Sequence, residues 1–146
     1  MCEIQEHNHD TIVVRGIPID AKLAPLINIL WSIGIRTIES CQEVQNHPLP
    51  IPIATISFET PDDATKFINL LAASSPQLRN DLLYLDDTPS DRGFRCYIWY
   101  QGSTGTGFAQ LFPTVTLEMP TDHIETATTD ITRHLSWVAL SAAAAK

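Results

Sequence analysis

Basic residues are scarce in this 146-residue chain, which has nine lysines and arginines against 17 aspartates and glutamates. The formal net charge is -8 at pH 7 with histidine neutral, and the basic residues form no run. Nonspecific binding to nucleic acid needs a basic surface that neutralises phosphates. We therefore expect no nucleic-acid partner.

Cysteine is also sparse, because the chain has three cysteines that lie far apart in sequence, Cys2, Cys41 and Cys96. An odd, scattered set does not make a disulfide framework, and no pair has the C-x-x-C spacing of a zinc or redox site. A domain of this size buries roughly two thirds of its unfolded surface. Its core therefore needs neither disulfides nor a metal.

Long apolar runs are missing as well. No stretch reaches the ~18–20 apolar residues that a helix needs to span a bilayer. The first residues lack the basic start and the apolar centre of a signal peptide. We therefore expect a cytoplasmic protein with no membrane partner.

The residues that are present have the composition of a globular domain, 44% hydrophobic and 18% charged. We expect a single α+β domain over residues 1–146. Within it, residues 1–10 are expected to form a flexible, polar N-terminal arm. Residues 141–146, which are rich in alanine, are expected to form a flexible C-terminal tail.

Hydrophobic spacing predicts the order of the elements. Short runs rich in β-branched or aromatic residues indicate strands, and apolar residues at i, i+3, i+4 and i+7 indicate helices. Strands are predicted over residues 11–15, 35–40, 53–59, 94–100 and 108–118, and helices after Asp20, Thr60, Ser75 and Asp122.

The expected helix starts share a pattern in which an aspartate follows a proline by two residues. The pattern occurs at Pro18 and Asp20, Pro61 and Asp63, and Pro120 and Asp122. Asp20 and Asp122 are predicted N-caps, whereas Thr60 is the predicted N-cap of the middle helix and Asp63 completes a capping box. Such caps recur for physical reasons, and an internal duplication of a strand-helix unit is the alternative.

Residues 53–59 alternate between apolar and polar side chains. Ala54, Ile56 and Phe58 share one face, and Thr55 and Ser57 share the other. This pattern predicts a half-buried strand with one face on the core and one in solvent.

Residues 11–71 run strand, helix, strand, strand, helix, and the strand over 94–100 would complete a βαββαβ unit. Within this span, Leu26–Leu30, Gly34–Ile35, Ala54–Phe58 and Ala64–Leu71 resemble the ACT-type, ferredoxin-like regulatory domain. The resemblance implies a ferredoxin-like core with an additional C-terminal strand and helix, and helices mainly on one face of the sheet. It also implies binding of an amino acid or other small metabolite, usually at a dimer interface.

The candidate ligand-binding residues are Arg36, Glu39, Cys41 and Ser57. Cys41 ends the second predicted strand, where it could act as a nucleophile if a nearby base lowered its pKa. The alternative is a small buried cysteine with a packing role. No catalytic motif is present, so we favour a noncatalytic small-molecule-binding or protein-interaction module. The alternative is a small enzyme that uses Cys41 or a set of histidine and carboxylate side chains in a pocket.

Three other features suggest chemistry, but each has a plainer reading. His7, His9 and Asp10 form an H-x-H-D string that could begin a metal site, although further ligands are lacking and a polar arm is expected. The glycine-rich segment 102–107 lacks the ending of a phosphate loop, so a hairpin loop is expected. The aromatic strand over 94–100 could stack RNA bases, but core or interface packing is expected. We thus expect no metal and no cofactor.

The first predicted helix is apolar around much of its circumference. Besides its core stripe it carries Ile29, Trp31 and Ile33. Such a helix is buried on more than one side. We therefore expect a homodimer that forms through this helix.

Overall fold

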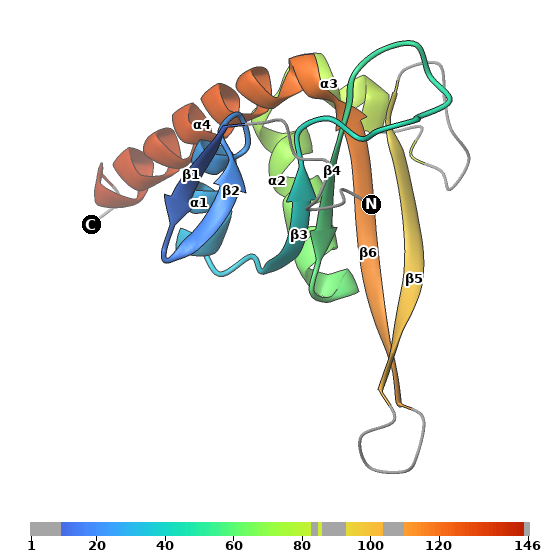
Figure 1. Ribbon diagram of the computed structural model, residues 1–146. Helices are drawn as coiled ribbons and strands as arrows, with labels where there is room; N and C mark the ends of the chain where they lie inside the picture. The colour runs from blue at the N-terminus through green and yellow to red at the C-terminus, as the bar shows by residue number, and fades with distance from the viewer. Residues whose placement is uncertain (1–9, 83–84, 86–92, 104–109, 145–146) are drawn as a thin grey trace.

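The computed structural model describes residues 10–82, 85, 93–103 and 110–144 (Figure 1). His7, His9 and residues 104–107 of the glycine-rich segment lie outside this range. The strands are β1 (Thr11–Val14), β2 (Ile17–Asp20), β3 (Thr37–Cys41), β4 (Ile53–Phe58), β5 (Arg95–Ser103) and β6 (Gln110–Pro120). The helices are α1 (Ala24–Ser32), α2 (Pro61–Ser74), α3 (Pro76–Leu82), η2 (Thr121–His123, a 3-10 turn) and α4 (Ile124–Ala144).

The main sheet is four-stranded, has the order β3-β4-β6-β5 and is antiparallel at every pairing. Helices α1, α2 and α4 lie on one side of this sheet, behind it in Figure 1. The expected α+β class and the placement of helices mainly on one face are therefore confirmed. We call the side away from these helices the open face.

The ferredoxin-like arrangement is not confirmed. In that arrangement the first strand belongs to the main sheet, whereas β1 pairs with β2 in a separate two-stranded hairpin. The C-terminal strand β6 is not an addition at the edge, because it lies between β4 and β5. The sheet is therefore completed by the β5–β6 hairpin.

The β1–β2 hairpin contains the strand that sequence reasoning missed. Its two-residue turn is Arg15-Gly16, with φ of 49° and 84°. Positive φ at both positions is the geometry that matches the twist of paired strands. The sequence pattern places Pro18 at a helix start, but it lies in β2, which is short and pairs on one side with β1, where proline is tolerated.

The N-terminus of α1 differs from the expectation. Its N-cap residue is Leu23, which makes no side-chain cap, so the prediction that Asp20 is the N-cap is wrong. The Asp20 carboxylate instead accepts a hydrogen bond from the backbone N–H of Gln42 at 2.9 Å. It thereby ties the end of β2 to the end of β3. Helix α1 ends at Ser32, and Gly34 terminates it as expected, two residues on, with φ of 84°.

The apolar circumference of α1 is largely covered by the chain itself. The β1–β2 hairpin and α4 both pack against this helix. Ile29 and Trp31 are half-buried against the core, and Ile33 is 43% exposed. Intrachain packing thus accounts for most of the apolarity from which a dimer was inferred, and the dimer stays a prediction.

The start of α2 confirms the predicted cap. Thr60 Oγ1 accepts from the Asp63 N–H at 3.1 Å, and the Thr60 hydroxyl donates to Asp63 Oδ2 at 2.7 Å. The start of α4 does not, because Asp122 lies inside the preceding 3-10 turn and no side chain caps that turn. The expected tail is helical over residues 141–144, since α4 runs to Ala144. No described helix is long and apolar enough to cross a membrane.

The core lies between the sheet and the helices. Ile56, Phe58 and Leu117 from the central strands are fully buried there with Phe67 and Leu71 of α2. Strand β4, however, is buried along its whole length, on both faces. The expectation that the polar face of this strand is exposed to solvent is therefore wrong. Its polar residues Thr55 and Ser57 are buried on the open face of the sheet.

Candidate functional site

The strand register aligns polar side chains into two rows across the open face. One row runs Glu39, Ser57, Thr116, Tyr97 from β3 to β5, and the next runs Cys41, Thr55, Glu118, Arg95. Successive strand residues point to opposite faces, so both rows lie on the side away from the helices. Pairing alone therefore brings into one row residues that are up to 77 positions apart in sequence, as with Glu39 and Thr116.

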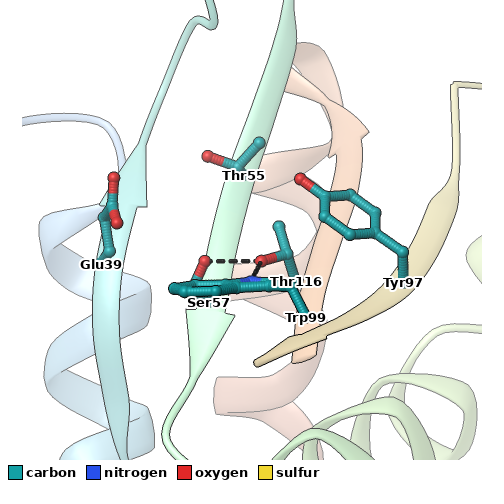
Figure 2. Close-up of a pocket in the computed structure, with 6 residues that line it drawn as sticks. All are labelled: Glu39, Thr55, Ser57, Tyr97, Trp99 and Thr116. Carbon is teal, nitrogen blue, oxygen red and sulfur yellow. Dashed lines mark hydrogen bonds between the residues drawn. The ribbon is translucent and has the colours of Figure 1, made fainter. Parts of the chain in front are cut away.

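A cavity of about 160 Å³ is hollowed into this face. We call it the open-face cavity, and its lining residues are Glu39, Thr55, Ser57, Tyr97, Trp99 and Thr116 (Figure 2). Each of the four strands of the main sheet contributes to the lining. Binding sites are concave and combine apolar or aromatic walls with a few placed polar groups, which is the composition found here.

A hydrogen-bonded unit forms the floor of the cavity. The Trp99 indole N–H donates to Thr116 Oγ1 at 2.8 Å, and Thr116 Oγ1 lies 2.7 Å from Ser57 Oγ. In Figure 2 the indole reaches from β5 across Thr116 toward Ser57. The ring orientation is thus fixed by its N–H bond, so the aromatic wall is formed before any ligand arrives.

Thr55 is a buried residue whose hydroxyl makes no hydrogen bond within the described part of the protein. The residue is 6% exposed, lines the cavity, and makes no side-chain hydrogen bond to any described residue. Buried polar groups are nearly always hydrogen-bonded to other protein groups or to ordered water. Since no fully buried side-chain atom in the described residues lacks a partner, the Thr55 hydroxyl is not fully enclosed and is open to the cavity that the residue lines.

Beside the cavity, His47 ties the 42–52 loop to the sheet. His47 Nε2 lies 3.0 Å from Glu118 Oε1, and both side chains are 8% exposed. His47 Nδ1 accepts the backbone N–H of Leu49 at 3.1 Å. The proton therefore sits on Nε2, which donates it to Glu118. Both ring nitrogens already have hydrogen-bond partners within the protein. We therefore call the His47–Glu118 pair the loop latch and interpret its role as structural rather than as acid–base catalysis.

Burial and the neighbouring charges of Glu118 and Arg95 shift the pKa of the Tyr97 side chain. Burial raises the pKa of the Tyr97 phenol, and the negative charge of Glu118 raises it further. Arg95 opposes this effect, with its guanidinium 4.5 Å from the centre of the Tyr97 ring and 3.8 Å from Glu118. Tyr97 is therefore a neutral hydrogen-bonding group throughout the physiological pH range.

The structure places three of the four candidate residues named from sequence on the open face. Glu39 and Ser57 are cross-strand neighbours that both line the cavity. Cys41 pairs with Thr55 in the adjacent row, is fully buried and is disulfide-bonded. The expectation of a free cysteine there is therefore wrong. In a disulfide the sulfur is no thiolate, so chemistry at Cys41 requires prior reduction.

Arg36 lies apart from the other three. Its Nε is 3.2 Å from Glu59 Oε2 and 4.0 Å from Asp63 Oδ2. It borders a second, more open cavity of about 360 Å³ that Arg15, Ile17 and Trp31 also line. Because its charge is already opposed by two carboxylates, Arg36 is less suited than Glu39 to bind a ligand by charge.

Sequence reasoning missed Thr55, Thr116 and the role of Tyr97 and Trp99. The aromatic strand was identified, but its pairing with β6, and the central place of β6 in the sheet, were not predicted. The signal that could have found the site is the polar alternation in two strands, Thr55-x-Ser57 and Thr114-x-Thr116. Hydroxyls repeated on one face of two neighbouring strands indicate a shared polar floor.

Comparison with known proteins identifies no relative, so a function must be argued from the geometry of the site. No protein-family model, no curated protein and no solved structure matches the chain. Among the described residues, no three histidine, cysteine, aspartate or glutamate side chains gather closely enough to hold a metal ion.

Proposed function

We propose that this protein is a noncatalytic binding module that takes up a small molecule in the open-face cavity. The observation that carries the proposal is Thr55, a residue only 6% exposed, whose side chain lines the cavity and makes no hydrogen bond with the described residues. The fixed indole of Trp99 beside it supports the same reading. A preformed wall lowers the ordering cost of binding.

A thermal-shift screen over amino acids, sugars, amines, nucleotides and divalent metals tests this function. A ligand present at 100 times its dissociation constant adds about 2.7 kcal/mol to the free energy of unfolding, which is a readily measured rise in melting temperature. The site is tested with Thr55→Val, which removes the hydroxyl at nearly constant volume. The matched control is Thr114→Val, because Thr114 is 2% exposed and does not line the cavity.

We expect at least one compound class to stabilise the protein, and Thr55→Val to reduce that stabilisation. Thr114→Val is expected to keep the full ligand effect, whatever it does to the melting temperature without ligand. A screen in which no compound raises the melting temperature contradicts the proposal. Equal ligand responses from both variants would place binding elsewhere.

We also propose that the module is a homodimer, as its first helix suggested. Ile33 at the end of α1 is 43% exposed and supports this proposal, as does Ile17 of the adjoining hairpin at 51%. Light scattering at micromolar concentration is expected to give twice the chain mass, and Ile33→Asp to give a monomer. Ile38→Asp is the control, because Ile38 is equally exposed, at 43%, on β3. A monomeric wild type would refute the dimer.

A further inference from the structure

The charge of the open-face cavity indicates what class of molecule it binds. Of the six described residues that line it, only Glu39 is charged. Its carboxylate has no hydrogen bond or ion pair with any described residue. Glu59 and Glu118, by contrast, lie 3.2 Å from Arg36 and 3.0 Å from His47. A half-buried carboxylate without a counter-charge attracts a cation, and the attraction is stronger in a cavity than in open water.

The aromatic wall has the same preference. In Figure 2 the Trp99 indole is seen edge-on, so one of its faces is turned toward the space bounded by Glu39, Thr55 and Tyr97. The face of an indole carries negative electrostatic potential and is the best aromatic surface for an organic cation. A cation in this space would thus meet a carboxylate on one side and a π face on the other.

The remaining charges do not favour an anion. Among the described residues, Arg95 is a positive group beside the cavity wall, with its guanidinium 4.5 Å from the centre of the Tyr97 ring. It lies 3.8 Å from Glu118, in the row beside the cavity. An anionic ligand would therefore face the Glu39 carboxylate, while Arg95, the described cation beside the cavity, is already opposed by a carboxylate.

Building on the function proposed above, we propose that the open-face cavity binds a small organic cation, an ammonium or quaternary ammonium compound. Its charge lies between the Glu39 carboxylate and the Trp99 indole, and its polar end bonds the Thr55 hydroxyl. A cavity of about 160 Å³ suits a compound of the size of choline or ethanolamine.

Titration calorimetry with a matched pair of probes tests the charge. Choline and 3,3-dimethyl-1-butanol have the same shape, but only choline carries a positive charge. We expect choline to bind at least about ten-fold more tightly than its neutral analogue, because a cation–π contact and a carboxylate each favour the charged form. Ethanolamine and acetate complete the set, as a primary ammonium and an anion.

Variants then assign the binding to the two groups. Glu39→Gln is expected to weaken choline binding about ten-fold and to leave the neutral analogue unaffected. Glu125→Gln is the control, because it removes the same charge from an exposed position at the start of α4. Trp99→Leu is expected to lose choline binding, whereas Trp99→Phe keeps an aromatic face and retains part of it. Circular dichroism melting of each variant shows that it is folded.

The outcomes separate this inference from the function on which it rests. Equal affinity for choline and its neutral analogue overturns the cation assignment and leaves small-molecule binding intact. The cation assignment is also overturned, and small-molecule binding kept, if acetate alone binds. The same conclusion follows if both ammonium probes fail while another class of compound binds in the thermal-shift screen. If no compound in either experiment binds, both proposals fail. A choline affinity that Glu39→Gln and Glu125→Gln change equally would mean a bulk-charge effect and overturns the site.

Discussion

At the scale of single residues, Asp63 connects a helix cap to the acid stability of the fold. Burial alone would raise its pKa, but the Thr60 hydroxyl, the Arg36 backbone N–H and the Arg36 charge together hold the pKa below its ordinary value of 3.8. A carboxyl whose pKa is lower in the folded than in the unfolded state stabilises the fold above the unfolded value. That contribution is lost as the pH falls through the folded value.

We therefore predict that Asp63→Asn lowers the free energy of unfolding at pH 7, and that its difference from wild type shrinks as the pH falls below about 4. Urea denaturation at a series of pH values measures this. Asp62→Asn is the control, because the Asp62 side chain is 76% exposed and its ion pair with Lys66 lies on the surface. A difference that stays constant down to pH 3 would mean that Asp63 acts through packing rather than charge.

His47 is the second residue with a clear structural consequence. We predict that His47→Ala costs about 1–3 kcal/mol, because it leaves the buried Glu118 oxygen without the donor 3.0 Å away. Adding Glu118→Gln is expected to recover part of the loss, since a neutral amide is less costly to bury. Denaturation of the two single variants and the double variant measures the coupling. If the losses of unfolding free energy in the two single variants simply add up in the double variant, the His47–Glu118 interaction does not stabilise the fold.

At the scale of elements, α4 consists of two parts with different roles. Ile124, Ala127 and Ile131 in its first half are buried against the core. Residues 136–144 are exposed throughout, including Trp137 at 64% and Leu140 at 72%. Figure 1 shows this second half extending past the sheet to the C-terminus. The first half of α4 therefore contributes buried side chains to the core, whereas the second half is helical but contributes none.

We predict that truncation after Leu135 reduces the helical circular dichroism signal but changes the free energy of unfolding by no more than about 0.5 kcal/mol. Ile131→Ala, within the buried half, is expected to cost about 2–5 kcal/mol. Thermal and urea denaturation distinguish the two. A large loss on truncation would mean that the exposed apolar residues are covered in solution, which a dependence of the melting temperature on protein concentration would confirm.

At the scale of the whole molecule, β6 joins the parts of the fold. It pairs with β4 on one side and β5 on the other, and α2 packs on it. Its helix-side residues Val115, Leu117 and Met119 enter the core, and Thr116 of the same strand lines the cavity. A change in the core side of this strand should therefore affect the sheet, the helices and the site together.

We predict that Leu117→Ala, at a fully buried position, costs about 2–5 kcal/mol. Ile98→Ala is the matched comparison on β5, where Ile98 is 58% exposed, and is expected to cost less than about 1 kcal/mol. Unfolding followed by both far-ultraviolet circular dichroism and tryptophan fluorescence is expected to coincide for each variant. Separate transitions for the two signals would show that the sheet and the helices do not unfold as one unit.

The sequence by itself determined the local structure of this protein. The α2 cap at Thr60 and Asp63, the end of α1 at Gly34 and the strands β3, β4 and β5 follow from neighbouring residues alone. Capping, glycine conformation and side-chain periodicity act within a few residues, so a single chain segment encodes them. The predicted N-caps Asp20 and Asp122 are wrong for different reasons. Asp20 bonds the backbone of Gln42 instead, and Asp122 lies inside a 3-10 turn.

Only the tertiary structure decided how the strands pair, and with that the site. A hairpin turn at Arg15-Gly16 removed the first strand from the main sheet, and β6 took a central place in it. That placement set Glu39, Ser57, Thr116 and Tyr97 in one row. Strand pairing joins residues far apart in the chain, and each strand's alternation fixes which side chains share a face but not which strands become neighbours. The cavity is a property of that pairing, so no segment of the sequence contains it.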